Sequence, residues 1–170
     1  MGNRTVLLAA TFTAASIAAT SAQSQDAAQW AGFYAGGAIN TYSLELNGLG
    51  PFPIALGTDT GAGIFAGYNH ALTPDIVIGG ELGYNFGTNY TIFGGTPISV
   101  DSSITLRGRA GYATGNVLIY GTLGYVSADA SITGAPFTLD VSGINYGVGL
   151  EAMIANNLSA RIEYSMSDLD

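Results

Sequence analysis

Apolar and polar residues alternate with a period of two along most of this chain. In residues 103–112 (SITLRGRAGY) one phase is apolar or small, and the other carries polar and charged side chains. The first phase comprises Ile104, Leu106, Gly108, Ala110 and Tyr112, and the second comprises Ser103, Thr105, Arg107, Arg109 and Gly111. Because successive side chains of a β-strand point to opposite faces, this pattern predicts a strand with one apolar face. Soluble antiparallel sheets and membrane barrels both contain such strands.

The same pattern predicts seven strands in all. Their expected ranges are 33–44, 60–71, 76–90, 100–113, 117–129, 138–153 and 158–167. The segments 33–44 and 117–129 are mixed on both faces, whereas the other five have a clear apolar phase. No charged residue falls in the middle of a strand on a face assigned as apolar.

The connections between these segments alternate between short and long. Residues 72–75, 114–116 and 155–157 are short and have the composition of tight turns. The links 45–59, 91–99 and 130–137 are longer and rich in Gly, Pro and Thr. Outer-membrane barrels combine short periplasmic turns with longer external loops, so this alternation favours that architecture and a periplasmic N-terminus.

The N-terminal residues are typical of a secretory signal. Arg4 supplies a positive charge, residues 6–19 are apolar or small, and residues 20–22 (TSA) suit signal peptidase. We therefore expect residues 1–22 to be a cleaved signal peptide and residues 23–170 to form one domain. A buried N-terminal helix and an uncleaved anchor are the alternatives.

Composition places the alternating strands in a membrane. Only 9% of the residues are charged and 48% are hydrophobic, whereas a soluble surface usually carries about 25–35% charged residues. After residue 22 no apolar stretch reaches the roughly 20 residues that a spanning helix needs. A closed barrel is the other structure that pairs every backbone group in lipid. The predicted fold is therefore an all-β, up-and-down antiparallel transmembrane β-barrel.

The polar faces of the predicted strands combine many glycines with a few long charged residues. These charged residues are Glu81, Arg107, Arg109, Glu151, Arg161 and Glu163. The interior of a barrel of about eight strands is just wide enough for side chains to fill. Three acids and three bases balance, and an unpaired buried charge would be strongly unfavourable. We therefore predict a structural ion-pair network in the lumen, in preference to a gate or a proton path.

Short motifs in a fixed order resemble one family. They are WAGFYAGG at 30–37, FAGYN at 65–69, GELGY at 80–84, LRGRAGY at 106–112, LGY at 123–125 and ARIEY at 160–164. Together they resemble the strands of small outer-membrane β-barrel proteins of the alphaproteobacterial porin-like, opacity-type family, over nearly the whole mature chain. The resemblance implies an eight-stranded barrel in a Gram-negative outer membrane.

The strand count departs from that pattern. Bacterial barrels have an even number of strands, and the sequence predicts seven. The family usually ends on a strand with a terminal aromatic residue, which the barrel assembly machinery recognises, whereas residues 167–170 read SDLD. An open sheet would leave two unpaired edges in lipid. We expect a C-terminally incomplete eight-stranded barrel; domain-swapped completion and a true seven-stranded form are alternatives.

The candidates for enzymatic and metal chemistry are weak. His70 is the only histidine and lies at a turn, without an evident serine and acid partner. The chain has no cysteine, and Asp59 and Asp101 lack the spacing of a calcium loop. A pair formed by Glu81 and Glu151 would be held ionised by the nearby arginines, which suits ion pairing better than acid catalysis. We predict no catalytic, cofactor or metal site.

Three functional hypotheses follow. The first is a non-enzymatic outer-membrane barrel with an envelope-structural or surface-interaction role, with weak pore activity as an option. Its expected partners are outer-membrane lipid and the barrel assembly machinery, with no surface ligand specified. A net charge of −8 argues against nucleic acid. The second is a soluble secreted or periplasmic barrel that binds an apolar ligand inside, and the third is an outer-membrane lipid-modifying enzyme that uses His70.

Overall fold

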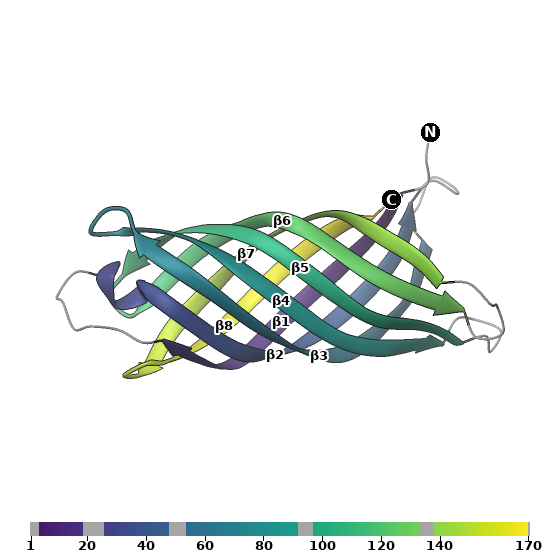
Figure 1. Ribbon diagram of the computed structural model, residues 1–170, viewed down its shortest axis with the longest axis horizontal. Helices are drawn as coiled ribbons and strands as arrows, with labels where there is room; N and C mark the ends of the chain where they lie inside the picture. Colours follow the sequence, from purple (N-terminus) through teal and green to yellow (C-terminus); the bar gives the residue numbers. More distant parts are fainter. Residues whose placement is uncertain (1–3, 19–25, 48–53, 92–96, 133–137, 170) are drawn as a thin grey trace.

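The computed structural model describes residues 4–18, 26–47, 54–91, 97–132 and 138–169, and these form a closed antiparallel barrel (Figure 1). Each strand pairs with its neighbours in the sequence, and β1 also pairs with β8. The strands are β1 (Arg4–Ala18), β2 (Gly32–Asn47), β3 (Ile54–Ala71), β4 (Ile76–Thr91), β5 (Pro97–Thr114), β6 (Val117–Ile132), β7 (Thr138–Ala155) and β8 (Leu158–Leu169). A short 3₁₀ helix, η1 (Ala28–Trp30), precedes β2. Among the described residues no helix is long and apolar enough to cross a membrane.

The predicted fold class is confirmed, and all seven predicted strands are present as β2–β8. Several extend further toward the long loops than predicted. The ladder between β4 and β5, for example, continues to the pair Thr91 and Pro97. Sequence alternation fades there, but backbone pairing persists because each added residue pair satisfies further N–H and C=O groups.

Strand β1 occupies the position of the eighth strand, which the sequence pattern does not predict. It pairs with both β8 and β2, so the open edges expected for a seven-stranded sheet are closed. The physical reason is the cost of unpaired strand edges, which a neighbouring apolar segment relieves by adding one strand. The assignment of residues 1–22 to a signal peptide stays a prediction, because a short apolar segment suits both roles.

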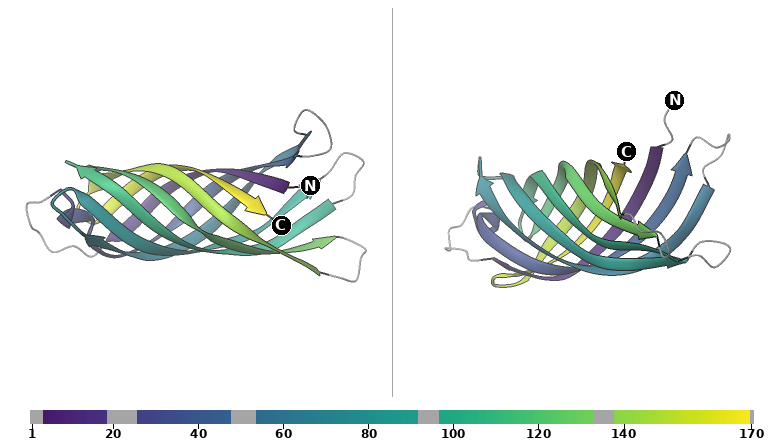
Figure 2. Two further views of the ribbon diagram at one scale, coloured as in Figure 1. Left: turned by 90° about the horizontal axis from the view of Figure 1, so that it is seen from above. Right: turned by 45° about the vertical axis from the view of Figure 1, so that its right-hand side comes forward.

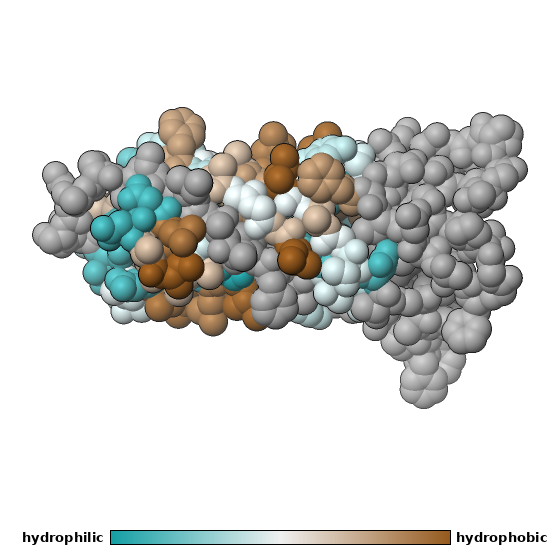
Figure 3. All heavy atoms as spheres, turned by 90° about the horizontal axis from the view of Figure 1, so that it is seen from below, coloured by the Kyte–Doolittle hydropathy of each residue, from teal (hydrophilic) through white to brown (hydrophobic). Residues whose placement is uncertain are grey.

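Burial follows the predicted alternation. The apolar phases point out of the barrel, and half or more of the side-chain surface is exposed at Leu106, Leu123 and Val148. On the face shown in Figure 3, hydrophobic side chains are spread along the described part of the barrel, and most of the hydrophilic ones lie toward the end at which tight turns join the strands. The outward aromatic residues are Phe33, Tyr68, Tyr84, Phe86, Tyr112, Tyr125, Tyr146 and Tyr164. The two strands that look mixed in sequence also alternate: Tyr34 and Tyr120 are buried, while Phe33 and Ile119 are exposed.

Three tight turns join strands at one end of the barrel, which is named the turn end below, and the opposite end is named the loop end (Figure 2). Gly115 and Asn157 have positive φ angles of 53° and 65°. Such backbone conformations suit two-residue hairpin turns and are most accessible to Gly and Asn. In the third turn, Thr73 Oγ1 accepts a 3.0 Å hydrogen bond from the Ile76 N–H. The three short connections predicted from the sequence are therefore turns in the structure.

Candidate functional site

All six charged residues predicted to line the lumen point inward from four strands. Glu81 lies on β4, Arg107 and Arg109 on β5, Glu151 on β7, and Arg161 and Glu163 on β8. Their placement follows from strand phase, because in each case the residues on either side along the strand face outward. The side chains are almost fully withdrawn from solvent; that of Arg107 is the most accessible, at 12%.

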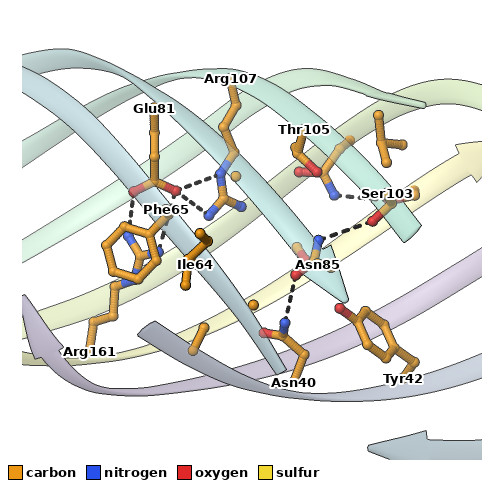
Figure 4. Close-up of a pocket in the computed structure, with 17 residues that line it drawn as sticks. Asn40, Tyr42, Ile64, Phe65, Glu81, Asn85, Ser103, Thr105, Arg107 and Arg161 are labelled. Carbon is orange, nitrogen blue, oxygen red and sulfur yellow. Dashed lines mark hydrogen bonds and ion pairs between the residues drawn. The ribbon is translucent and has the colours of Figure 1, made fainter. Parts of the chain in front are cut away.

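Glu81 lies at the centre of the lumen between two arginines (Figure 4). Its Oε1 is 2.6 Å from Arg107 Nη2, and its Oε2 is 2.6 Å from Arg161 Nη1. Arg107 is the direct cross-strand partner of Glu81 in the β4–β5 ladder, whereas Arg161 reaches it from the opposite wall. Charge-assisted hydrogen bonds of this kind are short and roughly twice as strong as neutral ones.

Two further ion pairs extend the network along the lumen. Arg107 Nη1 contacts Glu163 Oε1 at 2.5 Å, which connects β5 to β8. Toward the turn end, Arg109 Nη2 lies 2.8 Å from Glu151 Oε2, and Ser159 Oγ donates to the other oxygen of Glu151. The structure therefore brings all six predicted residues into four ion pairs, of which the pair of Arg161 and Glu81 joins opposite walls of the barrel.

Aromatic residues complete the network, and the sequence pattern does not predict them. Tyr34 Oη donates a 3.1 Å hydrogen bond to Glu81 Oε2, and Tyr120 Oη donates a 2.9 Å hydrogen bond to Glu163 Oε2. The guanidinium of Arg109 lies 4.1 Å from the Tyr120 ring centroid. These contacts give the buried charges cation–π and hydrogen-bond partners in addition to their ion pairs. The only sequence signal for both tyrosines was strand phase, which is ambiguous in these two strands.

Glycines on neighbouring strands leave the space that the tyrosine rings fill. A Cβ atom at Gly67 would overlap the Tyr34 ring and the Gly80 carbonyl oxygen. A Cβ atom at Gly149 would likewise overlap the Tyr120 ring. The concentration of glycine on the polar faces therefore has a steric cause, since small residues on one strand leave room for long side chains from the neighbouring strand.

A polar cavity lies on the loop-end side of the network (Figure 4). Its volume of about 80 Å³ is enough for a few water molecules. Arg107 and Glu81 line it, together with a chain of amides and a hydroxyl: Asn40 Nδ2 donates to Asn85 Oδ1 at 2.8 Å, and Asn85 Nδ2 donates to Ser103 Oγ at 3.1 Å. Neutral polar groups therefore line the cavity on its loop-end side, and paired charges line it on the side of the network.

Other chemistry has little support in the described residues. They contain no group of three or more His, Asp or Glu side chains arranged to hold a metal ion. His70 is exposed at the turn end of β3, on the outward-facing phase of the strand. The carboxylates of Glu81 and Glu163 each accept hydrogen bonds from arginine and tyrosine, so they are arranged for charge pairing.

An up-and-down barrel with an apolar exterior and a charged, filled lumen defines a class, the integral β-barrels of the bacterial outer membrane. Residues 12–170 match the model of the outer membrane protein beta-barrel domain family, and the chain belongs to that family. The resemblance noted from the sequence motifs is confirmed, and so is the outer membrane of a Gram-negative bacterium as the location.

Two known proteins are similar to this chain, one in sequence and one in structure. The chain is 32% identical over 146 residues to a 22 kDa outer membrane protein of Rhizobium leguminosarum bv. viciae; the match covers 84% of the chain and 65% of the relative. The structure also resembles that of Ail, the attachment invasion locus protein of Yersinia pestis, in complex with the heparin analogue sucrose octasulfate. That likeness has a TM-score of 0.46 and 9% sequence identity, and it covers 100% of both chains.

The alternative of a soluble barrel with an apolar interior is wrong. It requires apolar faces inside and charged faces outside, but the structure has the reverse arrangement: Leu106 and Val148 are exposed, whereas Glu81 and Arg161 are buried. Membership of an outer-membrane family and the outer-membrane relative agree with the structure on this point.

Proposed function

We propose that this protein is a non-enzymatic outer-membrane barrel with an envelope-structural role, and that its rigid wall displays the long loops for surface interaction. The observation that carries the proposal is the set of four ion pairs that fill the lumen. A narrow lumen filled by paired charges favours mechanical stability over transport, because a solute would have to break several buried pairs to pass.

The proposal assigns a structural role to Glu81, Arg107, Arg109, Glu151, Arg161 and Glu163. Each arginine of this set is paired with a carboxylate, and three carboxylates balance three guanidiniums. A gate or a proton path would need at least one member that is free to change its partner. The tyrosine hydroxyls that donate to Glu81 and Glu163 further fix the two carboxylates in place.

Electrical recording tests the absence of transport. Purified protein in a planar lipid bilayer is expected to give no stable conductance steps. A reproducible single-channel conductance from the folded protein, absent from protein denatured before reconstitution, would contradict the proposed filled lumen. The same preparation provides a control for folding, because a folded barrel migrates differently from a boiled one on gels.

Genetic complementation tests the structural role against the enzymatic hypothesis. Loss of the gene is expected to increase sensitivity to detergents, and the wild-type protein and the His70→Ala variant should restore resistance equally. A lipid-modifying enzyme that depends on His70 would instead lose complementation in that variant, with an altered profile of outer-membrane lipids.

A further inference from the structure

The segment that precedes β2 crosses the turn end of the barrel, away from the lumen network. It comprises Asp26, Ala27 and η1, and it lies at the end of the barrel opposite the C-terminus (Figure 1). Ala27 is fully buried and Trp30 is 4% exposed, although neither belongs to a strand. In the sequence Trp30 stands out only as part of a family motif, and its burial has no role in the proposed function.

Four hydrogen bonds hold the segment against the barrel. The Ala27 N–H donates to the Pro74 carbonyl oxygen at 2.8 Å, and the Gly115 N–H donates to Asp26 Oδ2 at 2.8 Å. Gln29 Nε2 donates to the Gly115 carbonyl oxygen, and Asn69 Nδ2 donates to the Trp30 carbonyl oxygen at 3.1 Å. The segment is therefore fastened to the β3–β4 turn, to the β5–β6 turn and to the inner face of β3.

Beneath these hydrogen bonds, an apolar layer fills the lumen. It consists of Ala27, Trp30, Val77, Ala113, Leu118 and Tyr120, with Ala71 and Met153 packed against it. Val77, Ala113 and Leu118 are at most 1% exposed, although each lies near the turn end of its strand. Tyr120 connects the apolar layer to the ion-pair network, because its ring belongs to the apolar cluster and its hydroxyl donates a hydrogen bond to Glu163.

We propose that Asp26–Trp30 is a plug that seals the turn end of the lumen, which is expected to face the periplasm. The lumen then contains two successive barriers, the ion-pair network and the apolar plug. The polar cavity is closed on the side of these barriers and opens toward the loop end. A hydrophobic constriction excludes ions by remaining dry, so the plug closes the lumen independently of the charged layer.

The aromatic ring of Trp30 is the main element of the seal. Its indole N–H has no hydrogen-bond partner among the described residues, although a buried Trp usually finds one. The side chain therefore contributes volume and apolar surface. Trp30→Phe should keep the seal, whereas Trp30→Ala should open it.

Cysteine accessibility tests the plug directly, because the native chain contains no cysteine. Ala113→Cys places a thiol inside the apolar layer, and Ala38→Cys places a matched thiol in the lining of the polar cavity. A charged methanethiosulfonate reagent is applied to each full-length folded variant in detergent micelles. We expect rapid labelling at position 38 and protection at position 113.

Adding Trp30→Ala should raise the labelling rate at position 113 by about tenfold or more, since labelling follows the population of the open form. The rate at position 38 should not change, and Trp30→Phe should leave position 113 protected. Equal labelling of positions 113 and 38 with Trp30 present would overturn the proposal. So would continued protection of position 113 in a folded Trp30→Ala barrel.

Heat-modifiable gel mobility restricts the measurement to folded protein. If Trp30→Ala gives no folded band, the double variant Asp26→Ala, Gln29→Ala removes both tethers to Gly115 while keeping the apolar layer. That variant should label faster at position 113 than its parent. An unchanged rate in that folded double variant would also overturn the plug.

Discussion

Arg161 on β8 forms an ion pair with Glu81 on β4 across the full width of the lumen, with 2.6 Å between Nη1 and Oε2. In the closed order of eight strands, β4 and β8 are four strands apart in either direction, so they lie on opposite walls. The pair therefore depends on closure of the barrel, unlike the pair of Arg107 and Glu81, which are cross-strand neighbours. The two charges of this pair can therefore neutralise each other only when the barrel is closed.

The first prediction concerns Glu81, which two arginines share. Glu81→Ala leaves both guanidiniums without this partner and should lower the free energy of unfolding by about 3–5 kcal/mol. Urea unfolding in detergent, followed by heat-modifiable mobility, measures the change. In a double-mutant cycle, Glu81 and Arg161 should couple by about 0.5–3 kcal/mol. Additive effects of the two single substitutions would show that the pair across the lumen contributes little.

The second prediction compares the two buried tyrosines. Tyr120→Phe and Tyr34→Phe each remove a hydrogen bond to a carboxylate, a loss of about 1.5–3 kcal/mol for a charged acceptor. The larger loss of stability is expected for Tyr120→Phe. Without the tyrosine hydroxyl, Glu163 keeps one arginine as a hydrogen-bond donor, whereas Glu81 keeps two. Urea midpoints of the two variants, measured side by side, test the order; a larger loss at Tyr34 would contradict it.

Strand phase predicted much of the lumen from the sequence alone. Arg107 and Arg109 could be placed inside because the opposite phase of the same strand is continuously apolar, and the charge balance indicated pairing. The pairing of Arg161 with Glu81 could not be predicted, since it depends on which strands face one another after closure. The inward positions of Tyr34 and Tyr120 could not be predicted, because β2 and β6 carry apolar residues on both faces. An aromatic residue that points into the lumen removes the contrast between an apolar outer face and a polar inner face.

The turn end was the least predictable part of the site. Trp30 belongs to a 3₁₀ helix of three residues, which has no periodicity for a sequence pattern to reveal. Its burial arises from contacts with residues far along the chain, such as Ala113 and Leu118. The position of β1 was also not predicted, because a short apolar segment that begins with a positive charge is typical of an export signal. In the structure this segment pairs with β2 and β8, whose edges would otherwise lack hydrogen-bond partners.

The third prediction concerns glycines that flank Tyr120. Gly149→Ala would place a Cβ atom against the Tyr120 ring and should destabilise the barrel by about 1–3 kcal/mol. Gly121→Ala is the matched control, because the nearest atom to its Cβ is a carbonyl oxygen at an ordinary 3.7 Å. The control should be neutral or stabilise the barrel by up to about 1 kcal/mol. Equal urea midpoints for the two variants would mean that Gly149 is not required for the position of Tyr120.

The fourth prediction tests which face meets lipid. Leu106 is 65% exposed in the middle of β5, next to the inward-facing Arg107. Leu106→Arg should destabilise the barrel in phospholipid vesicles by about 2–4 kcal/mol, because a charge at the bilayer midplane loses its hydration. Thr114→Arg, exposed at the turn end of the same strand, should have an effect of about 0–1 kcal/mol near the interface. Urea unfolding in vesicles measures the loss of stability in the two variants. The difference between the two losses should be smaller in a short-chain detergent micelle, where water reaches the middle of the barrel wall more easily. If the two variants unfold at the same urea concentration in vesicles, position 106 does not contact the hydrocarbon core, and the outward apolar face requires another explanation.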